Sequence, residues 1–383
     1  MSWELSEEHE AFRAVVADFA TNELGPHVER WDREQYFPVE AVRAMAELGL
    51  FGLIFPERWG GGGGDFASLC VAIEEIGRVD QSIGITLSAA VGLGANPIYQ
   101  FGTDEQRGRW LPDLVAGRRL GAFGLTEPDG GSDAGATRSR ATAVGGGWRL
   151  DGSKAFITNS GTELTSIITV TARTSDPGGA GISAFVVEAG TAGLVVEPAY
   201  RKIGWHASDT HGLTLDACWV PDDHLLGELG AGFRNFLTIL DDGRIAIAAL
   251  ALGCARACLE QATAYASERN AFGGPIGRNQ AIAFPLADMA VAVENSRNLT
   301  YKAAWLKDNG RPFGQAAAMA KLYATETAVA AARAATQVFG GAGFIEETPV
   351  ARMYRDSKIL EIGEGTSEIQ RLIIARSLGL PVR

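Results

Sequence analysis

The first part of the chain has hydrophobic residues at helical spacing. One helical face near the N-terminus carries Leu5, Phe12, Val15, Val16 and Phe19, with charged residues between them. The same period recurs in residues 38–50 and again from Phe66 to about Val115. Five consecutive glycines, residues 60–64, separate these stretches, and such a run neither holds a helix nor packs as a strand. We therefore predict a helical region interrupted by a flexible glycine loop.

The pattern changes to short β-branched runs in the middle of the chain. Gly, Asp or Pro bounds each run, as is typical of strands at close spacing. The runs are WRLDGSKAFITN (148–159), LTSIITVTAR (164–173), GISAFVVEA (181–189), GLVVEPAY (193–200) and HGLTLDACWV (211–220). They predict a sheet-rich domain built as an antiparallel sandwich or barrel.

The last part of the chain returns to long Ala- and Leu-rich helical patterns. We predict helices over residues 233–267, 280–308, 314–339 and 351–378. The fold class is therefore α+β and multidomain. It has an N-terminal helical domain (1–118), a middle antiparallel β domain (119–230) and a C-terminal helical bundle (231–383). The chain lacks βαβ alternation and a GxGxxG after a strand, which argues against a Rossmann nucleotide fold.

Composition and charge narrow the functional classes. The 383 residues are 46% hydrophobic and carry a net charge of −12. Because the chain is acidic, we expect neither a nucleic acid nor a membrane surface as its partner. We see no secretory signal and no apolar run of membrane-spanning length, so we expect a cytoplasmic protein. The five histidines have no ligand spacing and HExxH is missing, so we expect no metal site. Cys254 and Cys258 are expected to be small buried residues of a helix.

Two motifs point to the binding of a ring or a phosphate. In LTEPDGGSD (125–133), glycines allow Thr126, Ser132 and backbone N–H groups to face an anion or a heteroaromatic edge. In ERNAFGGPIGRNQAI (268–282), Arg269 suits a phosphate and Phe272 suits a ring. Both motifs also have an ordinary structural explanation, as a surface turn and as a helix cap.

Three further motifs are open to the same double interpretation. QVFGGAGF (337–344) ends a helix on paired glycines, which either cap the helix or let a ligand approach the backbone. DDGRI (241–245) puts Arg244 and Asp241 inside an apolar helix, either as a structural salt bridge or facing a channel. Finally, LEIGEGTSEI (360–369) places Glu364 between two glycines, so its carboxylate is either part of an ordinary loop or free to reach another group.

Taken in order, these motifs resemble the acyl-CoA dehydrogenase family along essentially the whole chain. The resemblance lies in LTEPDGGSD, DGSKAFITNSG, KIGWHASDTHGLTLDACWVP, ERNAFGGPIGRNQAI, QVFGGAGF, MYRDSKI and EGTSEIQR. It implies a C-terminal four-helix bundle behind the β domain, and FAD bound between the two. It also implies a homotetramer in which one subunit's flavin is completed by its neighbour, with electron-transfer flavoprotein as the electron acceptor.

The resemblance also implies which residues contact FAD. Those matching the family's contacts to the flavin ring and pyrophosphate are Phe123, Leu125, Thr126, Gly131, Ser132, Phe156 and Thr158. Those matching its contacts across the subunit interface are Arg269, Phe272, Gln280, Gln337, Gly340 and Gly341. Thr366 and Glu368 match residues on the adenosine half of FAD. Many family members have Trp at the position of Phe156.

Glu364 matches the family's catalytic base. In the implied reaction the base removes a proton from Cα of an acyl-CoA thioester, and the flavin takes a hydride from Cβ. Such a base needs to lie close to the proton and to have a raised pKa, and the N–H of Glu364 is expected to contact the thioester carbonyl. The residues expected near the acyl-CoA are Ser132, Asp241, Arg244, Gly365 and Arg376.

Two positions refine the expected substrate. Some family members carry the base at the position of Gly243, whereas here Glu364 is present, which favours a straight or short-branched acyl chain. Gly363 replaces a Tyr found in many members, which suggests room for a branch. The alternatives are an acyl-carrier-protein-thioester dehydrogenase, an acyl-CoA oxidase, and a non-catalytic flavin-binding protein of the same fold.

Overall fold

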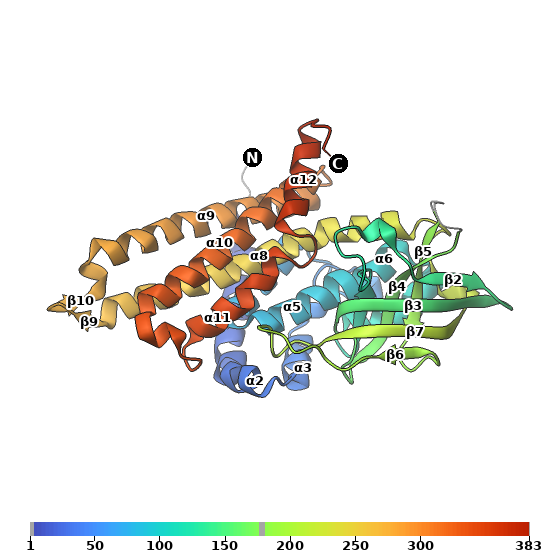
Figure 1. Cartoon of the computed structure of the whole chain (residues 1–383), viewed down its shortest axis with the longest axis horizontal. Helices are drawn as coiled ribbons and strands as arrows, with labels where there is room; N and C mark the ends of the chain where they lie inside the picture. Colours follow the sequence, from blue (N-terminus) through green and yellow to red (C-terminus); the bar gives the residue numbers. More distant parts are fainter. Residues whose placement is uncertain (1–3, 176–180, 383) are drawn as a thin grey trace.

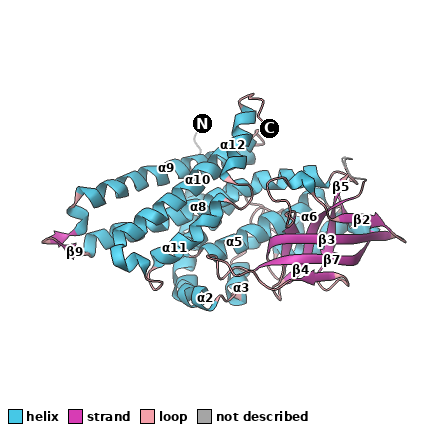
Figure 2. Cartoon of the chain, in the orientation of Figure 1, coloured by secondary structure: helices cyan, strands magenta, loops and turns pink. Residues whose placement is uncertain are grey.

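The computed structural model of the protein describes residues 4–175 and 181–382. Helices from the first and last parts of the chain pack together, and a sheet forms one end of the molecule (Figure 1). Figure 2 shows the strands gathered at that end, apart from a short hairpin at the opposite tip. The order of helices, sheet and helices confirms the predicted fold class.

The helices before the sheet begin at polar capping residues. Ser6 and Thr103 each take part in a reciprocal capping box, and Asp65 accepts the N–H of Ser68. The helices are α1 (Glu7–Phe19), α2 (Val28–Glu34), α3 (Val39–Glu47), α4 (Phe66–Val79), α5 (Gln81–Ala89), α6 (Asn96–Phe101) and α7 (Asp104–Val115). Short π-helical turns, Ala20–Leu24 and Ala90–Ala95, extend α1 and α5.

The sheet-rich part forms one eight-stranded sheet in which most neighbours are antiparallel. Its strands are β1 (Leu120–Gly124), β2 (Arg140–Ala143), β3 (Gly147–Thr158), β4 (Thr165–Arg173), β5 (Ile182–Glu188), β6 (Leu194–Val196), β7 (Thr210–Pro221) and β8 (Leu225–Leu226). The order is β6-β7-β3-β2-β4-β5-β8, and β1 pairs with β4 in parallel. β2 also pairs with β4 in parallel, at Arg140 and Arg173. These parallel pairs add to the antiparallel arrangement predicted from the sequence, and the β1–β4 pair lets β1 enter the sheet from the N-terminal helices.

Long helices follow the sheet. They are α8 (Gly232–Glu268), α9 (Gln280–Asp308), α10 (Gly314–Phe339), α11 (Pro349–Ser357) and α12 (Ser367–Ser377). The tip hairpin between α8 and α9 consists of β9 (Asn270–Ala271) and β10 (Gly274–Pro275). α8 is long and apolar enough to cross a membrane, but most of its apolar stretch is packed inside the protein as the central helix of the bundle.

The prediction of one helix over residues 351–378 is wrong, because the chain leaves helical geometry between α11 and α12. A 3-10 turn (Lys358–Glu361) follows α11, and α12 begins only after Thr366, which caps it. Glu364 (φ 52°) and Gly365 (φ 99°) both adopt the left-handed conformation between these segments. Left-handed residues cannot continue a right-handed helix, so the segment containing Glu364 projects as a turn.

The glycine run at residues 60–64 is a loop, as predicted, but it is not a loose one. The N–H groups of Gly62, Gly63 and Gly64 donate to the carbonyls of Gly52, Phe55 and Leu53, at 2.8 to 2.9 Å. A Cβ on Gly61 would overlap the carbonyl of Phe55. The glycines therefore serve close packing of backbone on backbone rather than flexibility.

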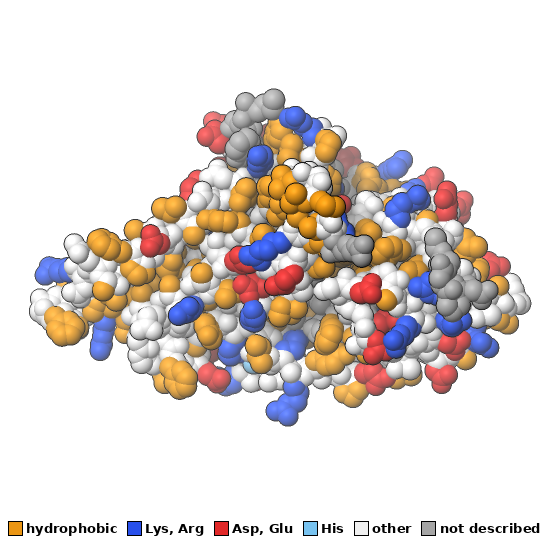
Figure 3. All heavy atoms as spheres, turned by 45° about the horizontal axis from the view of Figure 1, so that its top comes forward, with side chains coloured by type: hydrophobic (Ala, Val, Ile, Leu, Met, Phe, Trp, Pro, Cys, Tyr) orange, Lys and Arg blue, Asp and Glu red, His pale blue; other side chains and the backbone are white. Residues whose placement is uncertain are grey.

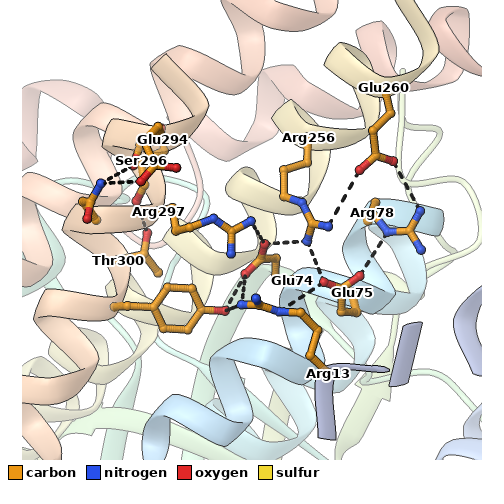
Figure 4. A network of polar contacts seen from close by, with 12 residues as sticks. Arg13, Glu74, Glu75, Arg78, Arg256, Glu260, Glu294, Ser296, Arg297 and Thr300 are labelled. Atoms are coloured by element: carbon orange, nitrogen blue, oxygen red, sulfur yellow. Dashed lines mark hydrogen bonds and ion pairs between the residues drawn. The ribbon is translucent and has the colours of Figure 1, made fainter. Parts of the chain in front are cut away.

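A buried ionic network fastens the N-terminal helices to the bundle (Figure 4). Glu74 and Glu75 on α4 are both buried, and Nη1 of Arg256 on α8 lies 2.6 Å from an oxygen of each. Arg297 on α9 lies 2.9 Å from Glu74, and Arg13 on α1 lies 3.5 Å from Glu75. Because buried carboxylates need compensating charge, this network ties four helices together.

Candidate active site

The turn between α11 and α12 places Glu364 against α8. An added Cβ at Gly243, in the middle of α8, would overlap Oε2 of Glu364. The carboxylate therefore occupies space that only a glycine leaves open. The two candidate positions for a catalytic base, 364 and 243, face the same point in the fold.

The surroundings of the Glu364 carboxylate favour its protonated form. Its Oε2 is sealed from solvent and has no hydrogen-bond partner among the described residues. Burial raises the pKa of Glu364 to about 7, although the positive charges of Lys321 and Arg244 act in the opposite direction. A carboxyl group with a pKa near neutrality is suited to accept a proton at physiological pH.

Arg244 and Asp241 lie together on α8, as the DDGRI motif suggested. They form an ion pair one helical turn apart, and the Arg244 side chain is buried. Arg244 also interacts electrostatically with Glu364. The structure therefore brings Arg244, Asp241 and Glu364 into one cluster, which includes Gly365 next to the base.

Lys321 on α10 also belongs to this cluster, and sequence reasoning missed it. Its side chain is fully buried, and its Nζ donates to the carbonyl of Gly365 at 2.8 Å. Nε2 of Gln370 donates to the same carbonyl at 2.9 Å. The available signal was a lysine inside the apolar stretch AAAMAKLYA (316–324), where buried lysines are rare unless paired.

The loop after β1 contains the LTEPDGGSD motif and is fixed by a buried ion pair. Nζ of Lys154 on β3 lies 2.7 Å from Oε1 of Glu127, and both side chains are buried. Glu127 also accepts the backbone N–H groups of Arg138 and Ser139, at 2.7 and 3.0 Å. The ends of the loop are therefore held rigidly, while Gly131 and Ser132 at its tip are exposed.

The helix α8 connects this loop to Glu364. Phe123 on β1 stacks on Phe236 of α8, with ring centroids 3.8 Å apart. Gly243 lies seven residues further along, on the same face of the helix and about 10 Å along its axis. The predicted ring-contacting strand and the predicted base are therefore neighbours in the fold.

The outer face of β3 offers an unpartnered aromatic surface beside this loop. Phe156 adopts a left-handed conformation (φ 62°) and is 65% exposed, and its ring lies tilted by 36° against Tyr200, with the ring centroids 5.1 Å apart. Thr158, two residues on, is half-buried. An exposed aromatic held in a restricted backbone conformation next to a glycine-containing loop fits a flat ring such as a flavin.

The structure does not bring the other set of predicted cofactor residues to this place. These residues are all exposed at the far tip of the bundle, and they are Arg269, Phe272, Gln280, Gln337, Gly340 and Gly341. The 37 residues of α8 separate the tip from the sheet by about 55 Å, and Figure 1 shows the two at opposite ends. No single FAD molecule spans that distance, so within one chain these two sets cannot bind the same cofactor.

The remaining predicted residues lie on or near α12. Thr366 caps this helix by accepting the N–H of Ile369, while Glu368 in its first turn and Arg376 in its last turn are exposed. Arg376 is more than two helical turns from the base. Among the described residues, no cluster of His, Cys, Asp or Glu is suited to hold a metal ion.

Comparisons with known proteins identify relatives over the whole chain. Family profiles described as acyl-CoA dehydrogenase N-terminal, middle and C-terminal domains match residues 6–118, 122–218 and 230–379. The short-chain specific acyl-CoA dehydrogenase of Bos taurus mitochondria is 45% identical over 377 residues, covering 98% of this chain and 91% of that protein.

Two solved structures share the fold closely. The butyryl-CoA dehydrogenase of Megasphaera elsdenii is 42% identical, with a TM-score of 0.96 over 99% of this chain and 100% of that one. A chain from a structure described as the electron transferring flavoprotein of Acidaminococcus fermentans has the same identity and TM-score, over 99% of both chains.

Proposed function

Because the chain belongs to the acyl-CoA dehydrogenase family and is an oxidoreductase, we propose that it dehydrogenates an acyl-CoA between Cα and Cβ with Glu364 as the base. The observation that carries this proposal is the Glu364 carboxylate beside Gly243, whose Oε2 is sealed from solvent and whose pKa is raised by burial to about 7. A thioester α-proton is weakly acidic, so its removal needs a base of matched pKa in a dry site.

The residues around Glu364 support the proton transfer in distinct ways. Among the described residues, none accepts the backbone N–H of Glu364, so this donor is available to a thioester carbonyl. A donor at that position stabilises the enolate oxygen as the proton leaves. Gly365 keeps side-chain bulk away from this N–H, and Arg244, held by Asp241, adds positive charge to the site.

FAD is the cofactor that these surroundings fit. When bound, it supplies the acceptor for the hydride from Cβ. The residues that would hold its ring and pyrophosphate are Phe123, Leu125, Thr126, Gly131, Ser132, Phe156 and Thr158. The exposed Phe156 ring and the rigid loop fixed by Lys154 and Glu127 are the features of the structure that favour this assignment.

We propose that a second copy of the chain completes each cofactor site within a homotetramer. Phe272 at the bundle tip is 99% exposed in a left-handed turn, and Phe284 and Phe344 nearby are also exposed. Large apolar side chains gathered on a surface mark contact sites. The face drawn in Figure 3 also has hydrophobic side chains scattered along the helical part of the molecule. In such an assembly the tip residues, with Arg269, Gln280, Gln337, Gly340 and Gly341, would reach a neighbour's FAD. Thr366 and Glu368, which directly follow Glu364, would contact the adenosine half of FAD.

A short or short-branched acyl chain is the proposed substrate. The relatives named above act on short chains or butyryl-CoA. At Gly363 an added Cβ would meet only the carbonyl of Ile359, at 3.5 Å, so the position has room beside the base. Electron-transfer flavoprotein is the proposed electron acceptor, and a cytoplasmic location remains the expectation from the sequence.

The function is tested with the purified FAD-loaded protein and its Glu364→Gln variant. We expect butyryl-CoA or 2-methylbutyryl-CoA to bleach the flavin of the wild type without oxygen. Glu364→Gln should keep its FAD but react at least ~100-fold more slowly, because general-base catalysis contributes that much. The control is Glu361→Gln, three residues away and paired with Lys358 on the surface, which should react normally.

Other outcomes of this experiment would contradict the proposal. Bleaching by carrier-protein thioesters but not by CoA esters would identify a carrier-protein dehydrogenase. When the reaction is repeated in air, peroxide formation at the rate of turnover would identify an oxidase. Full activity of Glu364→Gln would remove Glu364 from the mechanism, and a protein that binds FAD but reacts with no thioester would be a non-catalytic flavoprotein.

A further inference from the structure

We propose that Lys321 is a positioning residue for the base, which fixes the turn at Glu364 and favours the carboxylate form of that side chain. This inference rests on the proposed function and adds a residue to it. The ammonium group of Lys321 is enclosed in the bundle, on α10, whereas Arg244 lies on α8 and Glu364 in the turn before α12. It reaches the site from α10, the helix that packs most closely on α8.

The first part of the proposed role is mechanical. Glu364 and Gly365 both adopt left-handed conformations, which is costly for Glu364 because it has a Cβ. Such a turn persists only if its surroundings hold it. The carbonyl of Gly365 is held from two sides, by Nζ of Lys321 and by Nε2 of Gln370, at 2.8 and 2.9 Å. These two donors direct the Glu364 side chain toward Gly243.

The second part of the role is electrostatic. A neutral donor would suffice to hold a carbonyl, whereas burying an ammonium group costs free energy. Burial lowers the pKa of Lys321 to about 8, and the negative charge of Glu364 opposes this shift. Lys321 therefore still carries a positive charge at pH 7, and that charge attracts the ionised base. It counters the burial that raises the pKa of Glu364.

The other charged groups around Glu364 are less well placed than Lys321 to favour its carboxylate form. Arg244 also favours the carboxylate, but Asp241 neutralises much of its charge through their ion pair. Glu361 and Glu368, from the turn before the base and the helix after it, interact with Lys321 and lie toward the surface. Among the described residues, Lys321 is thus the buried positive charge near the base whose hydrogen bond goes to a carbonyl rather than to a carboxylate.

The experiment compares two substitutions that separate the charge from the hydrogen bond. Lys321→Met keeps the length of the side chain but removes the charge and the donor, whereas Gln370→Met removes only a neutral donor to the same carbonyl. The rate of flavin reduction by butyryl-CoA is measured from pH 5.5 to 9.5 without oxygen. We expect Lys321→Met to raise the apparent pKa of the base by about one unit. Relative to Gln370→Met, which also loses one donor to the Gly365 carbonyl, it should therefore react ~10-fold more slowly at pH 6 and at a similar rate above pH 9.

Gln370→Met should reduce the rate at every pH without moving the apparent pKa, and Lys321→Arg should restore the wild-type pKa. A Lys321→Met protein that folds, binds FAD and keeps the wild-type pH profile would overturn the proposal. If this variant does not fold, Lys321→Gln, which keeps a donor without the charge, takes its place with the same expectation.

A measurement without turnover separates this inference from the proposed function. The carboxylic-acid band of Glu364 is followed by infrared difference spectroscopy against the Glu364→Gln protein, without substrate. The titration midpoint should be higher in Lys321→Met than in wild type. An unchanged midpoint contradicts the role of Lys321 even if the enzyme is active. A raised midpoint in a protein that reduces no thioester contradicts only the proposed reaction.

Discussion

At the scale of single residues, the geometry of the site depends on the absence of a side chain at position 243. Gly243 leaves the space that the Glu364 carboxylate fills, so a side chain at 243 and a glutamate at 364 in this orientation cannot coexist. The sequence alone identified Glu364 and Gly243 through their resemblance to the family. It did not identify Lys321, because a lysine inside the apolar stretch 316–324 indicates burial but does not reveal which distant carbonyl the side chain holds.

The first prediction concerns Gly243→Ala. The added methyl group overlaps only the far end of a flexible side chain, so the Glu364 carboxylate should move rather than the helix. We expect the rate of flavin reduction to fall by at least ~10-fold, since small displacements of a catalytic group are costly, while the thermal midpoint changes little.

The matched control is Gly108→Ala, a glycine inside α7 with open space around its Cβ. It should be slightly more stable than wild type, by up to ~1 kcal/mol, and fully active. Equal activity of both variants would mean that the position of the Glu364 carboxylate is unimportant.

At the scale of elements, regular segments were predictable and irregular ones were not. Periodicity located α9 and α10 at their observed ends, because long amphipathic helices repeat one signal many times. The turn around Glu364 was hidden inside an apparently continuous helical pattern. The glycine run at 60–64 suggested flexibility, whereas its hydrogen bonds depend on residues 52–55 lying opposite, which the sequence pattern does not reveal.

The second prediction concerns the ion pair that holds the loop after β1. Glu127→Gln leaves the ammonium group of Lys154 buried without its counter-charge. Breaking a buried pair from one side costs about 3–5 kcal/mol, so we expect a loss of that size in urea unfolding and weaker retention of FAD.

The double variant Glu127→Gln with Lys154→Met removes both charges and should recover part of that stability. Its FAD affinity should remain below wild type, because the loop keeps fewer of its contacts. If the double variant is less stable than Glu127→Gln alone, the two charges do not act as a pair.

At the scale of the whole molecule, three parts of the chain meet at one ionic cluster. Asp32 on α2 pairs with Arg355 on α11, and Nδ1 of His206, in the segment before β7, lies 3.0 Å from Oδ1 of Asp32. Burial would raise the pKa of Asp32, but hydrogen bonds from His206 and Arg355 outweigh it and lower the pKa to about 2. The hydrogen bond to Asp32 raises the pKa of His206.

These shifts predict how stability depends on pH. The Asp32 contribution, about 2 kcal/mol, is present above its ordinary pKa near 4 and is lost as the pH falls toward 2. The His206 contribution is present below its ordinary pKa near 6.5 and is lost as the pH rises through its raised value. The cluster should therefore stabilise the protein most between about pH 4 and 6.5.

The third prediction follows from this cluster. Asp32→Asn should lower the free energy of unfolding at pH 5.5 by at least ~2 kcal/mol and make it less sensitive to acid. The control, Asp113→Asn, removes an exposed acid paired with Arg118 and should change stability by less than ~0.5 kcal/mol. Equal losses of stability in the two variants would show that the cluster of Asp32, His206 and Arg355 stabilises the protein no more than an exposed ion pair does.

The length of α8 has a consequence for inheritance if copies assemble as proposed. One end of this helix serves the chain's own cleft, and its far end serves a cleft in another molecule. A damaging substitution at the tip would then leave the active site of the substituted chain intact and impair the active site of the neighbouring chain. In a cell that makes both the wild-type chain and such a variant, the two would form mixed assemblies. Wild-type chains in those assemblies would lose activity as well.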